Sequence, residues 1–201
     1  MKSVLISIQP KWCELIASGK KTVEVRKTKP KLETPFKVYI YCTKSNNQFL
    51  QSRNNMYFYC EDRDFIGGHG AGAYQRLNGK VIGEFVCDRI TEYECSSEGH
   101  GQLATTCETC LTYDEIINYC NGNELYGWHI SDLVIYDKPK ELSEFYTETC
   151  ISFSNGFCTA PKFECDFQHY IYQGNIEPCV KKLTRPPQSW CYVESLRSDI
   201  E

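Results

Sequence analysis

Three charged side chains within six residues have types and a spacing that suit the binding of a small polar ligand. They are Lys21, Glu24 and Arg26. Because side chains alternate along a strand, Val23 and Val25 are predicted to enter a core while Glu24 and Arg26 face a cleft. Residues two apart on one strand face lie about 6.5–7 Å apart, so Glu24 can orient Arg26 or share a ligand with it.

The chemistry open to these groups is acid–base catalysis or electrostatic binding. A desolvated lysine can act as a base, and a glutamate can move protons or orient water. An arginine stays charged and can donate two parallel hydrogen bonds to a carbonyl or phosphate oxygen. The alternative is that Glu24 and Arg26 form an ion pair with each other at a strand edge and bind no ligand.

The elements that must position this motif follow from the hydrophobic pattern. Residues 3–9 alternate as a buried strand, and Pro10 suits the first position of a helix that carries Trp12. Gly19 suits the left-handed end of that helix, and a strand is predicted over 36–43. The other predicted elements are a helix over 113–120, capped by Thr112 and Glu115, and strands over 80–94, with a bend at Gly83, 128–136 and 190–196.

The motif Gly-x-Lys-x-x-Glu-x-Arg, which begins at Gly19, resembles the signature of the ASCH domain. The resemblance covers residues 2–43 and 80–93, and resumes at 127–145 and in the C-terminal strand. It implies an α+β fold, a small mixed β-barrel of the PUA-like kind with two or three short helices and loop insertions. It also implies recognition of RNA or a modified nucleoside.

The expected organisation is one barrel with two insertions. The barrel spans residues 1–145, with an insertion at about 45–79 that is rich in Asn, Gln and Gly and is predicted to be a long loop. A cysteine-rich insertion follows over 146–185. Residues 186–201 then supply a strand that pairs with the N-terminal strand and closes the barrel.

The resemblance leaves an enzyme as the alternative to a binding module. Some ASCH members are similar to amidohydrolases that remove the acetyl group of N4-acetylcytidine, and others resemble ribonucleases. In either enzyme, Lys21 and Glu24 are the catalytic candidates. The amidohydrolase members carry Thr at the position of Glu24, and this difference favours the wider ASCH pattern. Binding of RNA or a modified nucleoside is therefore the leading expectation.

Further ligand-binding candidates are polar or aromatic side chains near strand ends and turns. An aromatic side chain such as Trp12 can stack on a base. A ribonuclease-like site needs a Lys, a Tyr and a Ser around a ribose. The candidates, beside Arg26 and Trp12, are Tyr41, Lys44, His129, Ser131 and Ser189.

Composition limits the partners. The chain has 201 residues and a net charge of −4, which argues against sequence-blind binding to a phosphate backbone, so no DNA partner is predicted. Residues 11–44 nevertheless hold nine Lys or Arg against three Glu, which indicates a local anion site. No run of about 18 apolar residues and no signal pattern is found, so no membrane partner and a cytoplasmic location are expected.

Thirteen cysteines are unusual for a cytoplasmic chain, where thiols are expected to stay reduced. Cys107 and Cys110 have the spacing of half a zinc site or of a redox pair. A structural zinc is the one cofactor candidate, because thiolates bound to a metal can replace a missing core. Its candidate ligands are Cys150, Cys158, Cys165 and Cys179.

Overall fold

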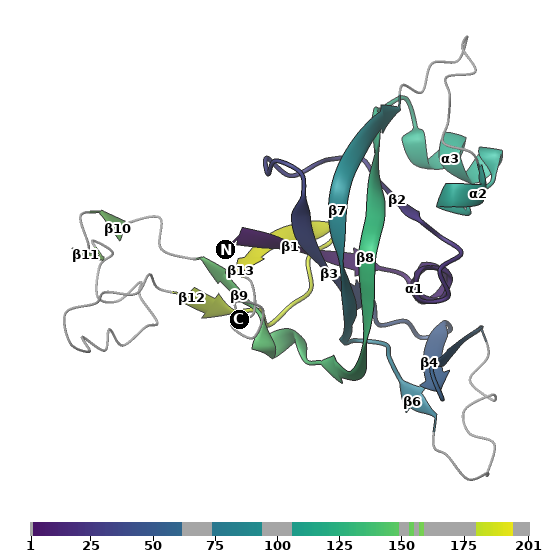
Figure 1. The fold of residues 1–201 in the computed structure, drawn as a ribbon, viewed down its shortest axis with the longest axis horizontal. Helices are drawn as coiled ribbons and strands as arrows, with labels where there is room; N and C mark the ends of the chain where they lie inside the picture. Colours follow the sequence, from purple (N-terminus) through teal and green to yellow (C-terminus); the bar gives the residue numbers. More distant parts are fainter. Residues whose placement is uncertain are drawn as a thin grey trace.

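The computed structural model describes residues 2–61, 74–93, 106–148, 153–154, 157–158 and 180–194. Strands dominate, and the helices are short, as expected for an α+β fold (Figure 1). In chain order the elements are β1 (Lys2–Ile8), α1 (Pro10–Ala17), β2 (Val23–Arg26), β3 (Phe36–Cys42), β4 (Phe49–Arg53), β5 (Met56–Cys60), β6 (Gln75–Arg76), β7 (Val81–Tyr93), α2 (Thr106–Thr109), α3 (Tyr113–Cys120), β8 (Leu125–Lys140), η2 (Leu142–Glu144), β9 (Tyr146–Glu148), β10 (Phe153–Ser154), β11 (Phe157–Cys158), β12 (Val180–Lys182) and β13 (Trp190–Glu194).

The largest sheet has six strands in the order β13-β1-β3-β7-β8-β2. β1 pairs parallel with β3 and antiparallel with β13, so the two terminal strands of the sequence lie side by side, as expected. β1 is buried on both faces: Val4 and Ile6 enter one apolar cluster and Leu5 enters another. Within the described residues β13 and β2 are unpaired edges, so the hydrogen-bonded order is that of an open sheet rather than a closed barrel.

β7 and β8 are the two longest strands and run antiparallel along most of the molecule (Figure 1). Their register shifts three times, and one shift lies between Val81 and Gly83, where the sequence predicts a bend. Another shift accompanies Asp132, whose φ is +46°. Bulges of this kind increase twist and let long strands curve around a core.

α1 begins at Pro10 and is followed by Gly19 with φ +72°, as the sequence predicts. The backbone N–H groups of Gly19 and Lys20 donate to carbonyl groups of the last helical turn. The left-handed glycine therefore ends the helix and turns the chain directly into β2. Cys13 and Ile16 are the side chains that α1 buries in the core.

Part of the first insertion is sheet, not the long loop expected over 45–79. β4, β5 and β6 form a three-stranded antiparallel sheet in the order β5-β4-β6. Asn54 and Asn55, both with positive φ, make the turn between β4 and β5. Phe49 and Leu50 are buried, which explains why a polar stretch folds here. The glycine-rich segment 67–72 lies outside the described residues.

The second insertion is described only in part. β9 pairs antiparallel with β12, and β10 with β11. Cys158 is described by its backbone in β11. The other three zinc-ligand candidates, Cys150, Cys165 and Cys179, lie outside the described residues.

Candidate functional site

β2 places the charged motif at the edge of the large sheet. Glu24 lies opposite Trp128 of β8, and Arg26 lies opposite Tyr126. Val25 points to the other face, where it packs in a cluster with residues of α3 and β8. The strand alternation therefore separates the charged and apolar side chains as the sequence predicts.

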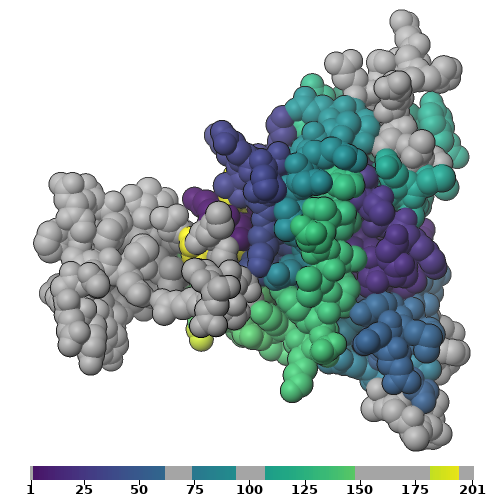
Figure 2. All heavy atoms as spheres, in the orientation of Figure 1, coloured from purple at the N-terminus to yellow at the C-terminus, as the bar shows by residue number. Residues whose placement is uncertain are grey.

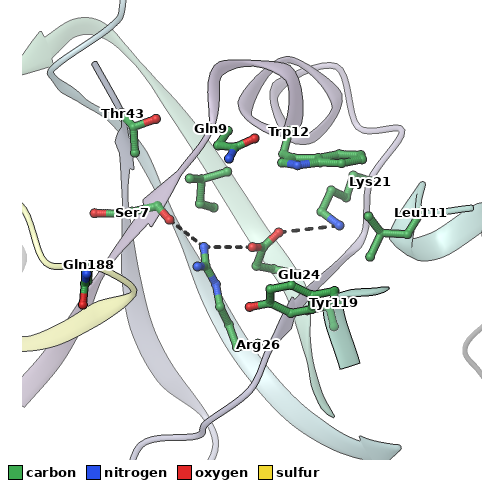
Figure 3. Close-up of a pocket in the computed structure, with 12 residues that line it drawn as sticks. Ser7, Gln9, Trp12, Lys21, Glu24, Arg26, Thr43, Leu111, Tyr119 and Gln188 are labelled. Carbon is green, nitrogen blue, oxygen red and sulfur yellow. Dashed lines mark hydrogen bonds and ion pairs between the residues drawn. The ribbon is translucent and has the colours of Figure 1, made fainter. Parts of the chain in front are cut away.

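The three charged groups form one row of ion pairs across the site (Figure 3). The Lys21 Nζ lies 3.5 Å from Glu24 Oε2, and the Arg26 Nη2 lies 2.9 Å from Glu24 Oε1. All three residues are buried, with exposed fractions of 2 % for Lys21, 6 % for Glu24 and 9 % for Arg26. Two cations thus share one carboxylate, which leaves an excess of positive charge in a poorly solvated place.

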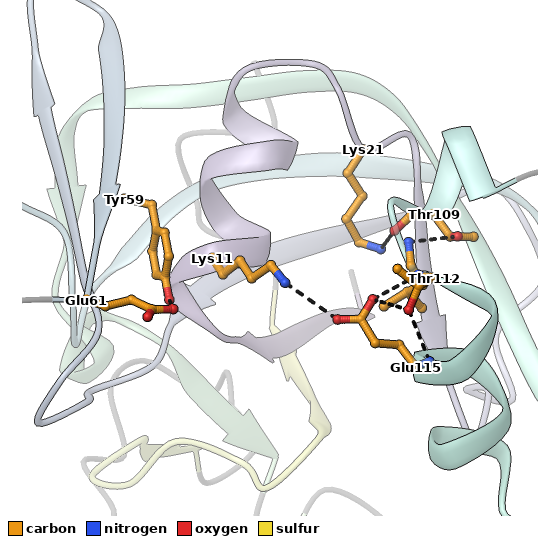
Figure 4. A network of polar contacts seen from close by, with 8 residues as sticks. Lys11, Lys21, Tyr59, Glu61, Thr109, Thr112 and Glu115 are labelled. Carbon is orange, nitrogen blue, oxygen red and sulfur yellow. Dashed lines mark hydrogen bonds and ion pairs between the residues drawn. The ribbon is translucent and has the colours of Figure 1, made fainter.

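Lys21 is held by the segment that carries α2. Its Nζ donates to the carbonyl oxygen of Thr109 at 2.5 Å, as Figure 4 shows, and lies 5.3 Å from the centre of the Trp12 ring. The backbone N–H of Thr22 donates to the carbonyl oxygen of Glu108 at 2.9 Å. In this geometry Lys21 is a hydrogen-bond donor and a positive charge.

Arg26 keeps one buried donor that no group in the described part of the chain accepts from. Its Nη2 donates to the carbonyl oxygen of Ser7 at 2.6 Å as well as facing Glu24. Its Nε is buried and has no hydrogen-bond partner among the described residues. A buried donor without an acceptor is costly to the folded state.

A cavity of about 350 Å³ opens beside this row. Trp12 and Tyr119 give it aromatic walls, and burial raises the pKa of the Tyr119 hydroxyl, with Arg26 acting in the opposite direction. Its polar lining combines hydroxyl and amide groups with the ion-pair row. The remaining lining residues are Ser7, Ile8, Gln9, Val25, Thr43, Leu111 and Gln188.

The cavity lies between segments that are far apart in the sequence. In the space-filling view the N-terminal residues (purple) reach the surface between a teal segment, which contains α3, and a blue segment, which contains β4 (Figure 2). Ser7 is joined to the C-terminal segment twice: its N–H donates to the Ser189 carbonyl and its Oγ to the Pro187 carbonyl. This brings Gln188 to the cavity.

The structure brings together four of the residues that the sequence singles out. Lys21, Glu24, Arg26 and Trp12 all line the cavity. Their joint placement follows from the helix, the glycine turn and the strand that succeed one another along the chain.

The other ligand-binding candidates do not line this cavity. Tyr41 is buried in the second apolar cluster, and the side chain of Lys44 packs over Gly79. Ser131 donates to the Val86 carbonyl at 2.9 Å. Ser189 lies beside the lining residue Gln188.

His129 lies on the opposite face of the β2–β8 pair from Glu24. Its Nδ1 is 2.6 Å from Asp88 Oδ1, and this hydrogen bond holds the pKa of the Asp88 carboxyl below its usual range. His129 is directly opposite Val23, on the strand face that Val25 shares and away from Glu24 and Arg26. The pair is a surface feature separate from the ion-pair row.

Sequence reasoning missed Tyr119, and in the segment 188–192, which it placed at the mouth of the site, it chose Ser189 instead of Gln188. Tyr119 belongs to α3, where its pattern is that of a partly exposed helix residue, and Gln188 lies in an irregular segment. Neither has a local signal, because only the packing of α3 and of the C-terminal segment brings them to β2.

Among the described residues, no group of three or more His, Cys, Asp or Glu side chains is arranged to hold a metal ion. Seven described cysteines are free thiols, Cys107 and Cys110 among them, in line with the expectation that thiols stay reduced. Cys120 differs from this expectation, because it is disulfide-bonded. No helix of the described chain is long and apolar enough to span a membrane.

Comparison with known proteins gives one family match. A sequence model of the ASCH domain matches residues 6–157. No curated protein sequence matches the chain. Among solved structures, ASCH from Zymomonas mobilis is similar with a TM-score of 0.45 and 19 % sequence identity, covering 70 % of this chain and 73 % of that one. A point variant of that protein gives a TM-score of 0.46 at 19 % identity, covering 71 % of this chain and 77 % of the variant.

Proposed function

This chain belongs to the ASCH domain family, and from that premise we propose that the cavity beside β2 binds RNA or a modified nucleoside. The family is PUA-like and is associated with RNA binding. The observation that carries the proposal is the buried row of Lys21, Glu24 and Arg26, because it sets fixed donors and an excess positive charge against a cavity with aromatic walls.

Each part of the cavity has a counterpart in a nucleoside. The aromatic surfaces of Trp12 and Tyr119 suit stacking with a base. The guanidinium of Arg26, which lines the cavity, suits a carbonyl or phosphate oxygen, and the side chain of Gln188 suits the edge of a base. At about 350 Å³, the cavity falls within the range of about 300–1,000 Å³ that is usual for small-molecule sites.

Hydrolysis is the alternative function, and the position of Glu24 at the cavity is the observation that favours it. Its carboxylate is buried at the cavity, where a carboxylate can orient water. Against this, the Lys21 Nζ donates to Thr109 and faces Glu24, whereas a lysine that acts as a base must present a lone pair. We therefore favour binding over removal of an acyl group from N4-acetylcytidine and over RNA cleavage.

Membership of the family also supports the proposal that the large sheet is part of a PUA-like barrel. β13 would then be the strand at which the barrel closes, beside β1.

The proposal is tested by calorimetric titration of the wild-type protein with N4-acetylcytidine and with cytidine, followed by chromatography of the same samples. We expect binding without turnover. Arg26→Lys should weaken binding by about tenfold or more, because a lysine keeps the charge and loses the fork of donors. Lys80→Ala, at an exposed ion pair with Glu141, is the matched control and should bind normally.

Lys21 separates the two functions. A binding site should tolerate Lys21→Arg better than Lys21→Ala, because arginine keeps the charge. Turnover by the wild type that both substitutions abolish would show that the protein is a hydrolase. Absence of binding to every nucleoside and RNA tested would overturn the proposal.

A further inference from the structure

The segment that carries α2 holds two free thiols within one helical turn. Cys107 and Cys110 flank Glu108 and Thr109 in the sequence. Cys107 is exposed and Cys110 is half-buried. The Cys110 Sγ lies 3.6 Å from the carbonyl oxygen of Cys107, so the second side chain turns back toward the first cysteine. Two thiols placed in this way can form a disulfide with each other.

Burial sets other free thiols of the protein apart from this pair. It raises the pKa of Cys87 to about 12 and that of Cys191 to about 11, and it raises the pKa of Cys13 as well. Such thiols stay protonated at neutral pH, whereas the reactive form is the thiolate. Among the free thiols of the described chain, Cys107 is the exposed one. An exposed thiol beside a second thiol is the arrangement typical of redox-sensitive cysteines.

The two residues between the cysteines hold the charged motif. The carbonyl oxygen of Thr109 accepts from the Lys21 Nζ at 2.5 Å, as Figure 4 shows, and the carbonyl oxygen of Glu108 accepts from the Thr22 N–H at 2.9 Å. Lys21 is one of the charged groups that line the cavity. A change in the backbone between Cys107 and Cys110 therefore reaches the cavity directly.

A disulfide between the two cysteines requires such a change. Side chains three residues apart on a helical turn have Cβ atoms about 5–6 Å apart, whereas a disulfide needs about 3.5–4.5 Å. The bond can therefore close only if the turn tightens, and the carbonyl groups of Glu108 and Thr109 belong to that turn.

The thiol hydrogen of Cys110 also has a structural role. Cys110 has φ +54°, in the left-handed region that residues other than glycine rarely adopt. Its Sγ donates to the carbonyl oxygen of Lys20 at 3.4 Å. A strained backbone conformation persists only where surrounding contacts hold it. A disulfide removes this donor, because the sulfur then carries no hydrogen.

We propose that Cys107 and Cys110 form a redox-active dithiol, which a peroxide oxidises to a disulfide that detaches α2 from Lys21 and Thr22. The Cys107 thiolate attacks a peroxide oxygen, the O–O bond breaks, and a sulfenic acid and hydroxide form. The Cys110 thiol then attacks the Cys107 sulfur, the S–S bond forms, and the sulfenic oxygen leaves as water with the Cys110 proton. The two sulfurs together lose two electrons, and the peroxide gains them.

The disulfide changes the surroundings of Lys21. Without the carbonyl oxygen of Thr109, the Lys21 ammonium keeps Glu24 as its charged partner and is otherwise turned toward the cavity and Trp12. The response requires no particular ligand in the cavity, so it stands apart from the proposed function.

The first test maps the disulfide itself. Purified protein is treated with an equimolar amount of hydrogen peroxide, its remaining thiols are blocked with N-ethylmaleimide, and it is digested with a glutamate-specific protease. Cleavage after Glu108 separates Cys107, in fragment 99–108, from Cys110, in fragment 109–115. Mass spectrometry should find these two fragments linked after peroxide treatment and separate without it. Fragments that stay separate in the treated protein would overturn the proposal.

The variants assign the link to this pair. Cys107→Ser and Cys110→Ser should each abolish the linked fragments. Cys60→Ser is the matched control, because it removes a half-buried thiol in β5, and it should leave the link unchanged.

The second test measures the coupling to the motif by hydrogen exchange at the Thr22 amide. Peroxide treatment of the wild type should accelerate this exchange by about fivefold or more, as expected when one hydrogen bond is lost. Cys107→Ser keeps the thiol of Cys110, and the same treatment should leave its Thr22 exchange unchanged. A linked pair of fragments without faster exchange at Thr22 would overturn the coupling, and faster exchange in treated Cys107→Ser would show that the disulfide is not its cause.

Discussion

At the scale of single residues, Glu24 holds the site together. Its carboxylate lies between two buried cations and contacts both. Without it, Lys21 and Arg26 would face each other in a place where water cannot screen their repulsion. The arrangement therefore depends on the charge of Glu24 more than on its shape.

We predict that Glu24→Gln lowers the free energy of unfolding by about 3 kcal/mol, since breaking a buried ion pair leaves an uncompensated buried charge. Urea denaturation at neutral pH measures the effect. Glu92→Gln, which removes the carboxylate of an exposed ion pair with Lys29, should cost under about 1 kcal/mol. Similar midpoints for the two variants would show that the row contributes no more than a surface pair.

At the scale of elements, α3 forms part of the wall of the cavity. It supplies Tyr119 to the cavity and packs Ile116 and Cys120 against Val25 of the motif strand. Its N-terminus is fixed by a capping box between Thr112 and Glu115, and Lys11 of α1 lies 3.5 Å from the Glu115 carboxylate (Figure 4). The stability of a two-turn helix depends strongly on such contacts.

Thr112→Ala should lower the free energy of unfolding by about 1 kcal/mol, because it removes a cap from the helix. Hydrogen exchange should be accelerated more at the amides of α3 than at amides elsewhere in the protein, because local unfolding of α3 becomes easier. Asp114→Asn, in the same first turn but outside the capping box, is the matched control and should have a smaller effect. Equal exchange rates in the two variants would contradict the role given to the cap.

The cap should also depend on pH. The backbone N–H of Thr112 donates to the Glu115 carboxylate and holds the pKa of Glu115 below its usual range, and Lys11 acts in the same direction. A lowered folded-state pKa contributes stability above the unfolded pKa, about 4.3, and this is lost as the pH falls through the folded pKa. The stability difference between wild type and Glu115→Gln, measured at pH 7, should therefore shrink as the pH falls below about 4.3 and vanish below the folded-state pKa of Glu115. A difference that persists there would refute this assignment.

Substitutions at Gly83 of β7 and Gly127 of β8 show how closely these two strands are packed against their neighbours. A Cβ at position 83 would overlap the backbone carbonyl oxygen of Val134, whereas one at 127 would meet side-chain atoms of Tyr93 and Val23 within 3 Å. Gly83→Ala should cost about 3 kcal/mol and Gly127→Ala less, because side chains can move aside and a paired backbone cannot. Thermal denaturation of both variants checks the order, and the reverse order would contradict it.

At the scale of the whole molecule, the C-terminal strand links the parts of the site. β13 pairs with β1, and the segment before it meets Ser7 and supplies Gln188. Trp190 contacts Trp128 and Tyr192, and its Nε1 donates a hydrogen bond to Thr28 in the loop that follows β2. One strand thus contacts the core, the cavity lining and the loop that follows β2.

Trp190→Phe and Trp190→Ala should separate these roles. The phenylalanine keeps most of the packing and loses only the hydrogen bond to Thr28, so stability should change by about 1 kcal/mol. The alanine loses the packing of a half-buried indole as well and should cost about 2 kcal/mol or more. Urea denaturation of both variants measures the difference. A phenylalanine variant as unstable as the alanine variant would show that the hydrogen bond, not the ring, is decisive.

The sequence determined the local geometry of the motif. Pro10 and Gly19 set the two ends of α1, and the two-residue period of a strand put Glu24 and Arg26 on the face opposite Val25. Thr112 and Glu115 likewise predicted the start of α3. These features depend on neighbours within a few residues, which is why the pattern alone was sufficient.

The residues that surround the motif come from distant parts of the sequence and are known only from the tertiary structure. Thr109, Tyr119 and Gln188 reach β2 because α2, α3 and the C-terminal segment pack there, and none of them has a local signal. Tyr41 and Ser131 were predicted as site residues because they are polar and lie in strands. In the structure, Tyr41 is buried in the second apolar cluster, and Ser131 donates a hydrogen bond to the carbonyl oxygen of Val86. The three strands over 49–76 escaped prediction because their stability comes from burying Phe49 and Leu50 against distant residues. Contacts between distant segments depend on the whole fold, and no local pattern contains them.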